Sequence, residues 1–284
     1  MIKITECPRD AMQGIKDNIP TALKIEYQNL LLECGFNQLD FGSFVSPKAI
    51  PQMKDTKEVL SGLKLNQETD LIAIIANIRG AQDALQFNSI KYLGYPFSIS
   101  ETFQLRNTNS TINQSLESIK TINTLAAQNQ KELLVYISMG FGNPYKEEWS
   151  PEIVIHWVEK LAAIGIKHFA LSDTIGCSTP KNIKYLFENL IPKLPKLTIG
   201  AHLHSRADTI IEKVDAAIEA GCKNFDVAIK GYGGCPMAKD DLTGNMDTIV
   251  LLNHLNNKNI KHSVNMEKFN EAVEFSAKIF NHYH

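Results

Sequence analysis

Short apolar runs alternate with longer amphipathic segments along the whole chain. Eight of these runs have the length and apolar content of buried strands, and the segments between them have helical spacing. Strands that alternate with helices pair in parallel through right-handed crossovers. The predicted strands cover residues 2–6, 37–42, 71–76, 92–98, 133–138, 167–172, 197–203 and 223–229.

Three segments repeat the same junction between a helix and the next strand. Residues 30–41, 161–173 and 217–229 each end a helical pattern on glycine and then enter an apolar run. Glycine suits the left-handed position just past a helix C-terminus. Helix starts are also marked: Ser150 and Thr179 each precede a proline, the order expected for an N-cap and the first helical residue.

Eight such units predict a closed (β/α)8 TIM barrel with additional C-terminal helices. An open doubly wound sheet is the alternative, and the lack of a glycine-rich phosphate loop after the first strand weakens it. No linker or low-complexity segment divides the chain, so we expect residues 1–284 to form a single catalytic barrel domain. Residues after about 237 would form an active-site loop and the C-terminal helices.

The composition limits the classes of partner. Of the 284 residues, 44% are hydrophobic, 21% are charged and the net charge is −2, which predicts no nucleic acid or anionic membrane as partner. Five scattered cysteines indicate free thiols in a reducing compartment rather than a disulfide framework. The N-terminal residues lack a signal-peptide pattern, and no apolar stretch approaches about 18 residues, so we expect a cytoplasmic protein without a membrane span.

Polar residues follow the predicted strands, where a barrel places its catalytic groups. His202 and His204 are one residue apart in an apolar strand, so both point to the same face. A lone buried histidine is more often a hydrogen-bonded core residue, but a same-face pair together with Asp10 at another strand end favours a metal site. Two nitrogens and a carboxylate with open positions suit Mg²⁺ or Mn²⁺, with Zn²⁺ or Co²⁺ as alternatives.

A glycine-rich loop over residues 231–245 follows the last predicted strand. Three glycines in four residues let the backbone approach a ligand closely, and Cys235 comes directly after them. Such a loop could close over a site and deliver a thiol as an acid or base. The alternative is an ordinary flexible loop in which Cys235 has no chemical role.

Six motifs, in order along the chain, resemble those of the 3-hydroxy-3-methylglutaryl-CoA (HMG-CoA) lyases. This family is a branch of the metal-dependent barrel lyases and synthases, which also include the isopropylmalate and homocitrate synthases. The second motif distinguishes the lyase branch, whereas the fourth and fifth are shared with the condensing enzymes. The motifs, which lie between about residues 2 and 255, are "ECPRDAMQG", "SFVSPKAIPQM", "VYISMGFGNPY", "LSDTIG", "AHLH" and "GYGGCP…TGN".

The resemblance implies a (β/α)8 barrel, a divalent metal and a set of site residues. By motif, the metal ligands would be Asp10, His202, His204 and Asn245. Arg9 would bind the carbonyl where negative charge develops, and Cys235 would be an acid or base. The catalytic set would be Arg9, Asp40, Asp173, His202 and Cys235. We place the substrate-binding residues at Gln13, Lys16, Ser43, Tyr136 and Lys48, with Arg79 as a further candidate by position.

The implied reaction is the cleavage of HMG-CoA to acetoacetate and acetyl-CoA by a retro-Claisen mechanism, as in leucine catabolism. The partner would be a small acyl-CoA substrate, and we expect a homo-oligomer, a dimer. Two alternatives are a related aldolase or Claisen condensing enzyme acting on another hydroxy acid or hydroxyacyl-CoA, and an inactive barrel with a binding role. Three departures from the family pattern favour them: Asp40 replaces Glu, Ser205 and Arg206 replace "DT", and Ile249 replaces an acidic residue.

Overall fold

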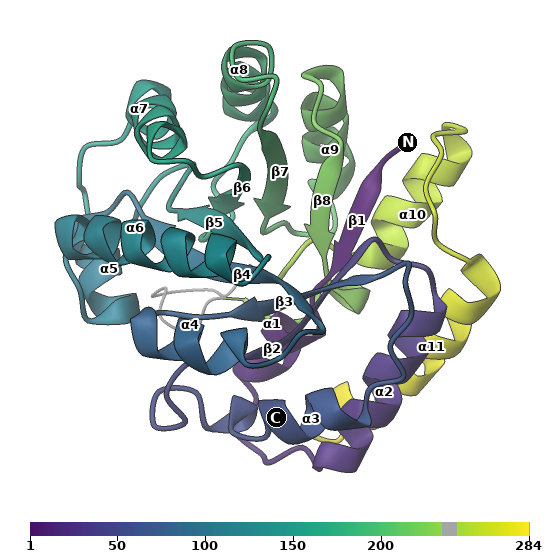
Figure 1. The fold of residues 1–284 in the computed structure, drawn as a ribbon. Coiled ribbons are helices and arrows are strands. Elements are labelled where there is room, and N and C mark those ends of the chain that lie inside the picture. The colour runs from purple at the N-terminus through teal and green to yellow at the C-terminus, as the bar shows by residue number, and fades with distance from the viewer. Residues whose placement is uncertain (235–242, 284) are drawn as a thin grey trace.

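Eight parallel strands close into a barrel in the computed structural model, which describes residues 1–234 and 243–283 (Figure 1). Neighbouring strands pair in chain order, and β1 pairs with β8 to close the ring. This confirms the predicted (β/α)8 barrel and rules out the open doubly wound sheet. Each strand lies within two residues of its predicted bounds: β1 (Lys3–Glu6), β2 (Gln38–Ser43), β3 (Asp70–Ile74), β4 (Ile90–Ser98), β5 (Glu132–Ser138), β6 (His168–Asp173), β7 (Thr198–Leu203) and β8 (Asn224–Val227).

Helices surround the barrel and return the chain to the start of each next strand (Figure 1). They are α1 (Pro8–Gln13), α2 (Thr21–Glu33), α3 (Thr56–Gly62), α4 (Ile78–Leu85), α5 (Glu101–Thr108), α6 (Ile112–Gln128), α7 (Pro151–Ala163), α8 (Pro180–Leu190), α9 (Ile210–Glu219), α10 (Thr248–Asn257) and α11 (Met266–Phe280). Short 3₁₀ turns occur at Pro51–Met53 and Ile229–Gly231.

The helix boundaries have the local causes that the sequence indicates. The Ser150 side chain accepts a hydrogen bond from the Ile153 N–H, and Pro151 begins α7. At α8, Thr179 and Asn182 form a reciprocal capping box. The three glycines that follow α2, α7 and α9 all have positive φ, at 78° for Gly35, 95° for Gly165 and 91° for Gly221. These positions therefore require the conformational freedom of glycine.

The main hydrophobic core lies between the strands and the helices, and a second, smaller cluster fills the barrel interior. Gly94 of β4 makes room in that interior, because a Cβ there would lie 3.0 Å from Tyr136 Cε2 and closer still to Ile74. The glycine therefore lets the Tyr136 ring lie across the barrel beneath the site. The interior cluster consists of Ile72, Ile74, Leu134, Tyr136 and Ala170.

The C-terminal helices extend the shell on the side of β1 and β8 (Figure 1). The α11 helix packs against α2 through aromatic rings, with Tyr27 and Phe275 stacked at 6.3 Å between centroids. Phe280 stacks on Tyr232 at 4.1 Å, which fixes the start of the glycine-rich loop. Within the described ranges, no helix combines the length and apolar character that crossing a bilayer needs. The division into one domain stays a prediction.

Candidate active site and metal centre

A cavity of about 130 Å³ opens where the strands end, at the mouth of the barrel. Its polar lining includes Arg9, Asp10, His202 and His204. Its apolar lining includes Val45, Ile50, Ile74, Pro96 and Phe103. Catalytic groups of such barrels lie at this end, on the loops that follow the strands.

Three of the predicted metal ligands meet at this mouth. Asp10 lies in α1, which follows β1, while His202 lies in β7 and His204 directly after it. One oxygen or nitrogen atom from each lies within 4.8 Å of the other two. This set of two imidazoles and one carboxylate fits a divalent cation.

His204 has the properties expected of a metal ligand. The side chain is 3% exposed, and its Nδ1 has no hydrogen-bond partner among the described residues. Burial, together with the neighbouring His202, lowers the pKa of the His204 imidazole to about 4. The ring is therefore neutral at ordinary pH, the form that binds a metal.

Asn245 comes to the same place from the far side of the glycine-rich loop. Its amide nitrogen donates to Asp10 Oδ2 at 2.8 Å and to the Tyr232 carbonyl at 2.9 Å. These bonds use the nitrogen and leave the amide oxygen as the atom that could bind a cation. A β-bridge between His204 and Asn245 holds the two predicted ligands together.

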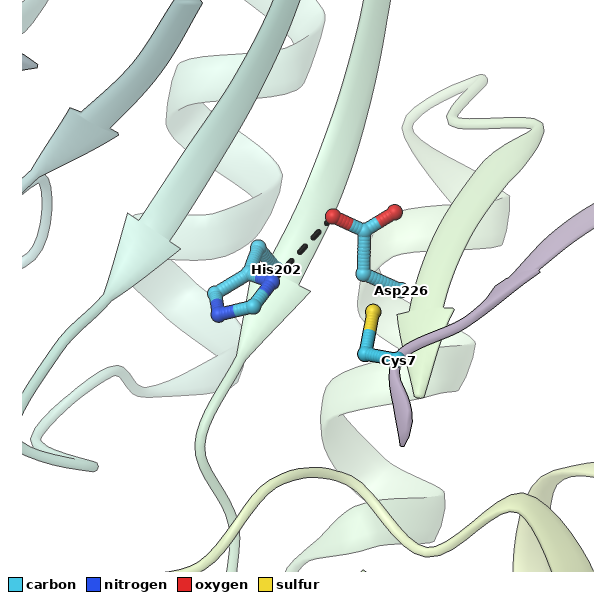
Figure 2. A group of neighbouring side chains, drawn as sticks. All are labelled: Cys7, His202 and Asp226. Carbon is cyan, nitrogen blue, oxygen red and sulfur yellow. Dashed lines mark hydrogen bonds and ion pairs between the residues drawn. The ribbon is translucent and has the colours of Figure 1, made fainter. Parts of the chain in front are cut away.

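The His202 ring forms a hydrogen bond with a carboxylate that the sequence interpretation missed. Figure 2 shows Asp226 of β8 beside His202, with its Oδ2 3.1 Å from the imidazole Nδ1. Although burial works in the opposite direction, this hydrogen bond raises the pKa of the His202 imidazole. Tyr136 lies against the same ring, edge to face, at 5.4 Å between centroids.

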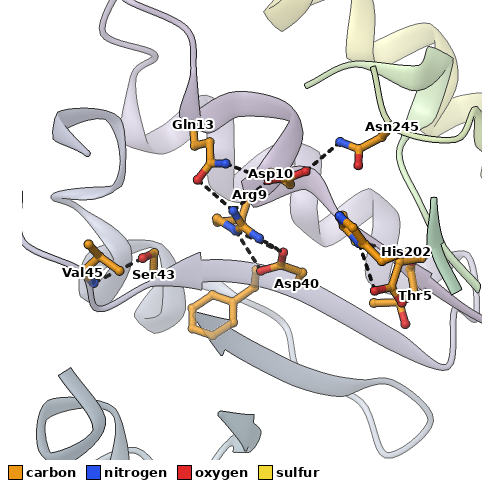
Figure 3. Close-up of polar contacts among 12 residues, drawn as sticks. Thr5, Arg9, Asp10, Gln13, Asp40, Ser43, Val45, His202 and Asn245 are labelled. Atoms are coloured by element: carbon orange, nitrogen blue, oxygen red, sulfur yellow. Dashed lines mark hydrogen bonds and ion pairs between the residues drawn. The ribbon is translucent and has the colours of Figure 1, made fainter. Parts of the chain in front are cut away.

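Arg9 lies between two carboxylates next to the metal site (Figure 3). Its Nε donates to both Asp40 oxygens at 3.1 and 3.0 Å, its Nη2 also donates to Asp40, and its Nη1 donates to Asp10 at 2.9 Å. Although burial works against the charge, the two carboxylates raise the pKa of the Arg9 guanidinium. A fixed cation therefore lines the cavity in a water-poor setting.

The two carboxyl groups beside Arg9 differ in their acidity. Burial raises the pKa of Asp40 to about 6, although Arg9 opposes the shift. Burial would also raise the pKa of Asp10, but Arg9, the two histidines and Asn245 together lower it below its ordinary value. Asp10 is therefore ionised over the whole neutral range, as a metal ligand must be.

Asp173 does not border the cavity but is linked to the site through Lys213. It is buried and accepts hydrogen bonds from the backbone of Cys177 and Ser178, both at 2.8 Å. The Lys213 ammonium, also buried, donates to Asp173 Oδ2 at 3.1 Å and to the His204 carbonyl at 2.9 Å. In this position Asp173 fixes the turn after β6, and its predicted catalytic role stays a prediction.

The five predicted substrate-binding residues separate into two groups. Gln13 and Tyr136 line the cavity, and Gln13 also hydrogen-bonds Arg9 and Asp10. Ser43 is buried outside it and accepts a hydrogen bond from the Val45 N–H. Lys16 and Lys48 are exposed and line two neighbouring clefts. Cys235 lies outside the described residues.

The sequence interpretation missed three buried charged residues, and one of them left a signal in the sequence. Asp226 is a carboxylate inside an otherwise apolar strand, a position that is costly without a partner. Lys213 gave no signal, because a lysine on an amphipathic helix normally faces water. Glu6 looked like the ordinary polar end of β1, yet its side chain is fully buried.

Residues 2–275 match the family model described as HMGL-like. The chain belongs to this family. It is 30% identical over 281 residues to the cytoplasmic 3-hydroxy-3-methylglutaryl-CoA lyase of Rattus norvegicus, with 99% of this chain and 81% of the relative covered. It is 32% identical over 268 residues to the hydroxymethylglutaryl-CoA lyase YngG of Bacillus subtilis, with 94% of this chain and 89% of the relative covered.

A solved structure of an HMG-CoA lyase from Acinetobacter baumannii, in complex with coenzyme A and 3-methylmalate, has the same fold with a TM-score of 0.93. The two sequences are 29% identical, and the alignment covers 99% of this chain and 92% of that one. This HMGL-like protein is a lyase. Family membership and fold, which the motifs predicted, are confirmed.

Proposed function

We propose that this lyase cleaves HMG-CoA to acetoacetate and acetyl-CoA with a divalent cation held by Asp10, His202, His204 and Asn245. The observation that carries the proposal is the cluster of Asp10, His202 and His204 beside the buried Arg9 in one cavity. The relatives named above are HMG-CoA lyases that align over most of their own length.

The reaction breaks the bond between C2 and C3 of the substrate. The tertiary hydroxyl gives its proton to a general base, C3 becomes the ketone of acetoacetate, and the thioester fragment leaves as an enolate that takes up a proton from a general acid. A divalent cation held by Asp10, His202, His204 and Asn245 would supply Lewis acidity that favours loss of the hydroxyl proton. Mg²⁺ or Mn²⁺ suits this mixed set of nitrogen and oxygen donors, with Zn²⁺ or Co²⁺ as competitors.

Arg9 supplies the charge that the enolate needs. Its guanidinium is fixed by Asp40, Asp10 and Gln13, so no reorganisation is required when negative charge develops on the thioester oxygen. Asp40 orients the guanidinium. The Tyr136 hydroxyl is buried without a partner among the described residues, and burial raises its pKa, so it stays a neutral group facing the cavity.

Proton transfer to the enolate is the step that we assign to Cys235. This assignment rests on the family resemblance alone. The His202 imidazole also borders the cavity, but a ring nitrogen that holds the cation cannot carry a proton at the same time, so a catalytic role for His202 stays a prediction.

The coenzyme A portion would extend from the cavity into two neighbouring clefts. One cleft meets the cavity at Gln13 and is lined by Lys16 and Lys54. The other meets it at Val45 and is lined by Lys48, Lys57 and Arg79, among other residues. Cationic side chains of this kind suit the phosphates of an acyl-CoA. The whole acyl-CoA molecule is too large for the cavity itself, so these phosphates would lie in the clefts.

Three broader assignments belong to the same proposal. We infer that the protein acts in the cytoplasm, as the name of the Rattus norvegicus relative states for that enzyme. We also infer a role in leucine catabolism and a homodimeric state. Sedimentation of the purified full chain tests the last of these, and a monomer at micromolar concentration would contradict it.

The alternative is an aldolase or condensing enzyme of the same family with a different hydroxy acid or hydroxyacyl-CoA. Asp40 favours it, because a side chain one methylene shorter than Glu places its carboxylate differently beside Arg9. A coupled assay for acetyl-CoA release from HMG-CoA with added Mn²⁺ decides between the two. Release supports the proposal, whereas no release combined with turnover of another 3-hydroxyacyl thioester establishes the alternative.

An inactive barrel with a binding role is the remaining alternative. The buried His204 Nδ1, which has no hydrogen-bond partner among the described residues, argues against it, because burying an unsatisfied polar atom is costly. Purified protein that binds none of Mg²⁺, Mn²⁺, Zn²⁺ and Co²⁺ would favour the inactive barrel.

A further inference from the structure

A buried carboxylate lies behind one of the predicted metal ligands, on the side away from the cavity opening. Asp226 of β8 and His202 of β7 are paired in the sheet register, so their side chains project from neighbouring strands. Figure 2 shows the Asp226 carboxylate directed at one ring nitrogen of His202, while the other nitrogen points away from it. The bond joins His202 Nδ1 and Asp226 Oδ2 at 3.1 Å.

We propose that Asp226 is the positioning residue that fixes the tautomer and the ring orientation of His202 for metal binding. This inference rests on the proposed function, because it requires a cation at Asp10, His202 and His204. A carboxylate that accepts a hydrogen bond from Nδ1 keeps the proton there. The lone pair of Nε2 is then available on the opposite side of the ring.

The surroundings of His202 leave the ring little freedom. The edge-to-face contact with Tyr136 is at 5.4 Å, and the His204 ring lies at 5.5 Å between centroids. The Asp226 side chain is itself only 9% exposed, so water competes poorly for its carboxylate. Among the contacts that the described residues make to this ring, the Asp226 hydrogen bond is the one that selects which nitrogen carries the proton.

The same carboxylate belongs to a second cluster that could be mistaken for another metal site. Cys7, His202 and Asp226 each place one ligand atom within 4.8 Å of the others. Burial raises the pKa of the Cys7 thiol, and nearby carboxylates including Asp226 raise it further, so the sulfur is a neutral thiol in the metal-free protein. Metal binding there would also have to displace the proton from His202 Nδ1. The cluster therefore supports the first site and does not compete with it.

The test measures Mn²⁺ affinity of the full chain by calorimetry. Loss of an outer-shell carboxylate typically weakens metal binding by about 10- to 100-fold, and we expect that range for Asp226→Ala, which leaves no acceptor for the Nδ1 proton. The matched control is Glu132→Ala. Glu132 pairs with His168 across neighbouring strands in the same way, but at the opposite end of the barrel, so its replacement should leave the affinity unchanged.

A second measurement separates this inference from the proposed function. Nitrogen NMR of the metal-free protein, at a pH where the His202 ring is neutral and with His202 assigned by its loss in His202→Gln, should find the proton on Nδ1. In Asp226→Ala we expect a mixture of tautomers. Wild-type protein that binds Mn²⁺ while Asp226→Ala binds it equally well would overturn the positioning role alone. A neutral His202 ring with its proton on Nε2 in the metal-free wild type would overturn it too. Wild-type protein that binds no Mn²⁺ would overturn the proposed function and this inference together.

Discussion

Arg9 and its carboxylates show what residue-level interpretation of the sequence could and could not provide. Two signals identified the site residues: the family resemblance, for Arg9 and Asp40, and a charged group directly after an apolar strand, for Asp10. They did not indicate that Asp40 holds Arg9 through several hydrogen bonds while Asp10 holds it through one. The geometry of these pairs depends on how α1 and β2 meet in the folded barrel, and no local sequence pattern encodes that.

Replacing Asp40 by alanine should cost both stability and activity. Arg9 would lose its main partner while staying buried, and breaking such a pair typically costs about 3–5 kcal/mol. Urea denaturation measures the stability, and turnover of HMG-CoA measures the activity. Asp55→Ala is the control, because it breaks the buried pair with Lys24 away from the cavity. We expect the control to lose stability but keep its turnover, and equal turnover in both variants would contradict the role of Asp40.

Glu6 predicts a pH dependence of stability. Burial raises its pKa to about 8, against hydrogen bonds from Thr248 Oγ at 2.7 Å and the Ile229 N–H at 2.8 Å. The Glu6 carboxyl holds its proton more tightly in the folded state than in the unfolded state. Its contribution to the stability of the folded state is therefore fully present below about pH 4.5 and is lost as the pH rises towards 8. Each pH unit in that window removes up to about 1.4 kcal/mol.

Glu6→Gln tests this directly, because glutamine mimics the protonated acid and still pairs with both neighbours. Denaturation curves between pH 5 and pH 8.5 should show a shallower decline for the variant than for the wild type, and the variant should be the more stable at the upper end. Parallel curves for the two proteins would contradict the raised pKa.

At the scale of helices and strands, the sequence was informative because the signals are local. N-caps, prolines and glycines after helices determine helix ends through contacts within four residues of the chain, so the starts of the two named helices were predicted. Apolar runs indicate which segments are buried, so all eight strands were predicted. The irregularity in β2 between Asp40 and Gly42 was not predicted. A bulge of this kind depends on the partner strand, whose register is set by the closed barrel.

The cap of α8 gives a prediction at this scale. Thr179→Ala removes the acceptor for the Asn182 N–H and breaks the capping box, which should cost about 1 kcal/mol. For a chain of this size that corresponds to a fall in Tm of roughly 2–4 °C by calorimetry. Thr209→Ala is the matched control, since Thr209 precedes α9 but makes no capping bond with its side chain. A fall as large in the control would show that the loss at Thr179 is not due to the cap.

At the scale of the whole molecule, barrel closure brings together residues that are far apart in the chain. Asp10 follows β1, the histidines lie on and after β7, and Asn245 lies beyond β8, so the site forms only when β1 pairs with β8. Fold-level resemblance predicted this assembly. Asp226 and Lys213 were missed because they act through the side chains and backbone of those ligands, and their roles become visible only in three dimensions.

A cation at this point should stabilise the entire fold. Because the ligands come from both ends of the chain, Mn²⁺ binds the folded state and has little affinity for the unfolded one. At a free concentration of 100 times Kd, linkage predicts a gain of about 2.7 kcal/mol, seen as a rise in Tm that a chelator reverses. His204→Gln should abolish the rise. His254→Gln should keep it, because His254 pairs with Asp215 between α9 and α10, outside the cavity. An equal rise in both variants would show that Mn²⁺ stabilises the protein elsewhere.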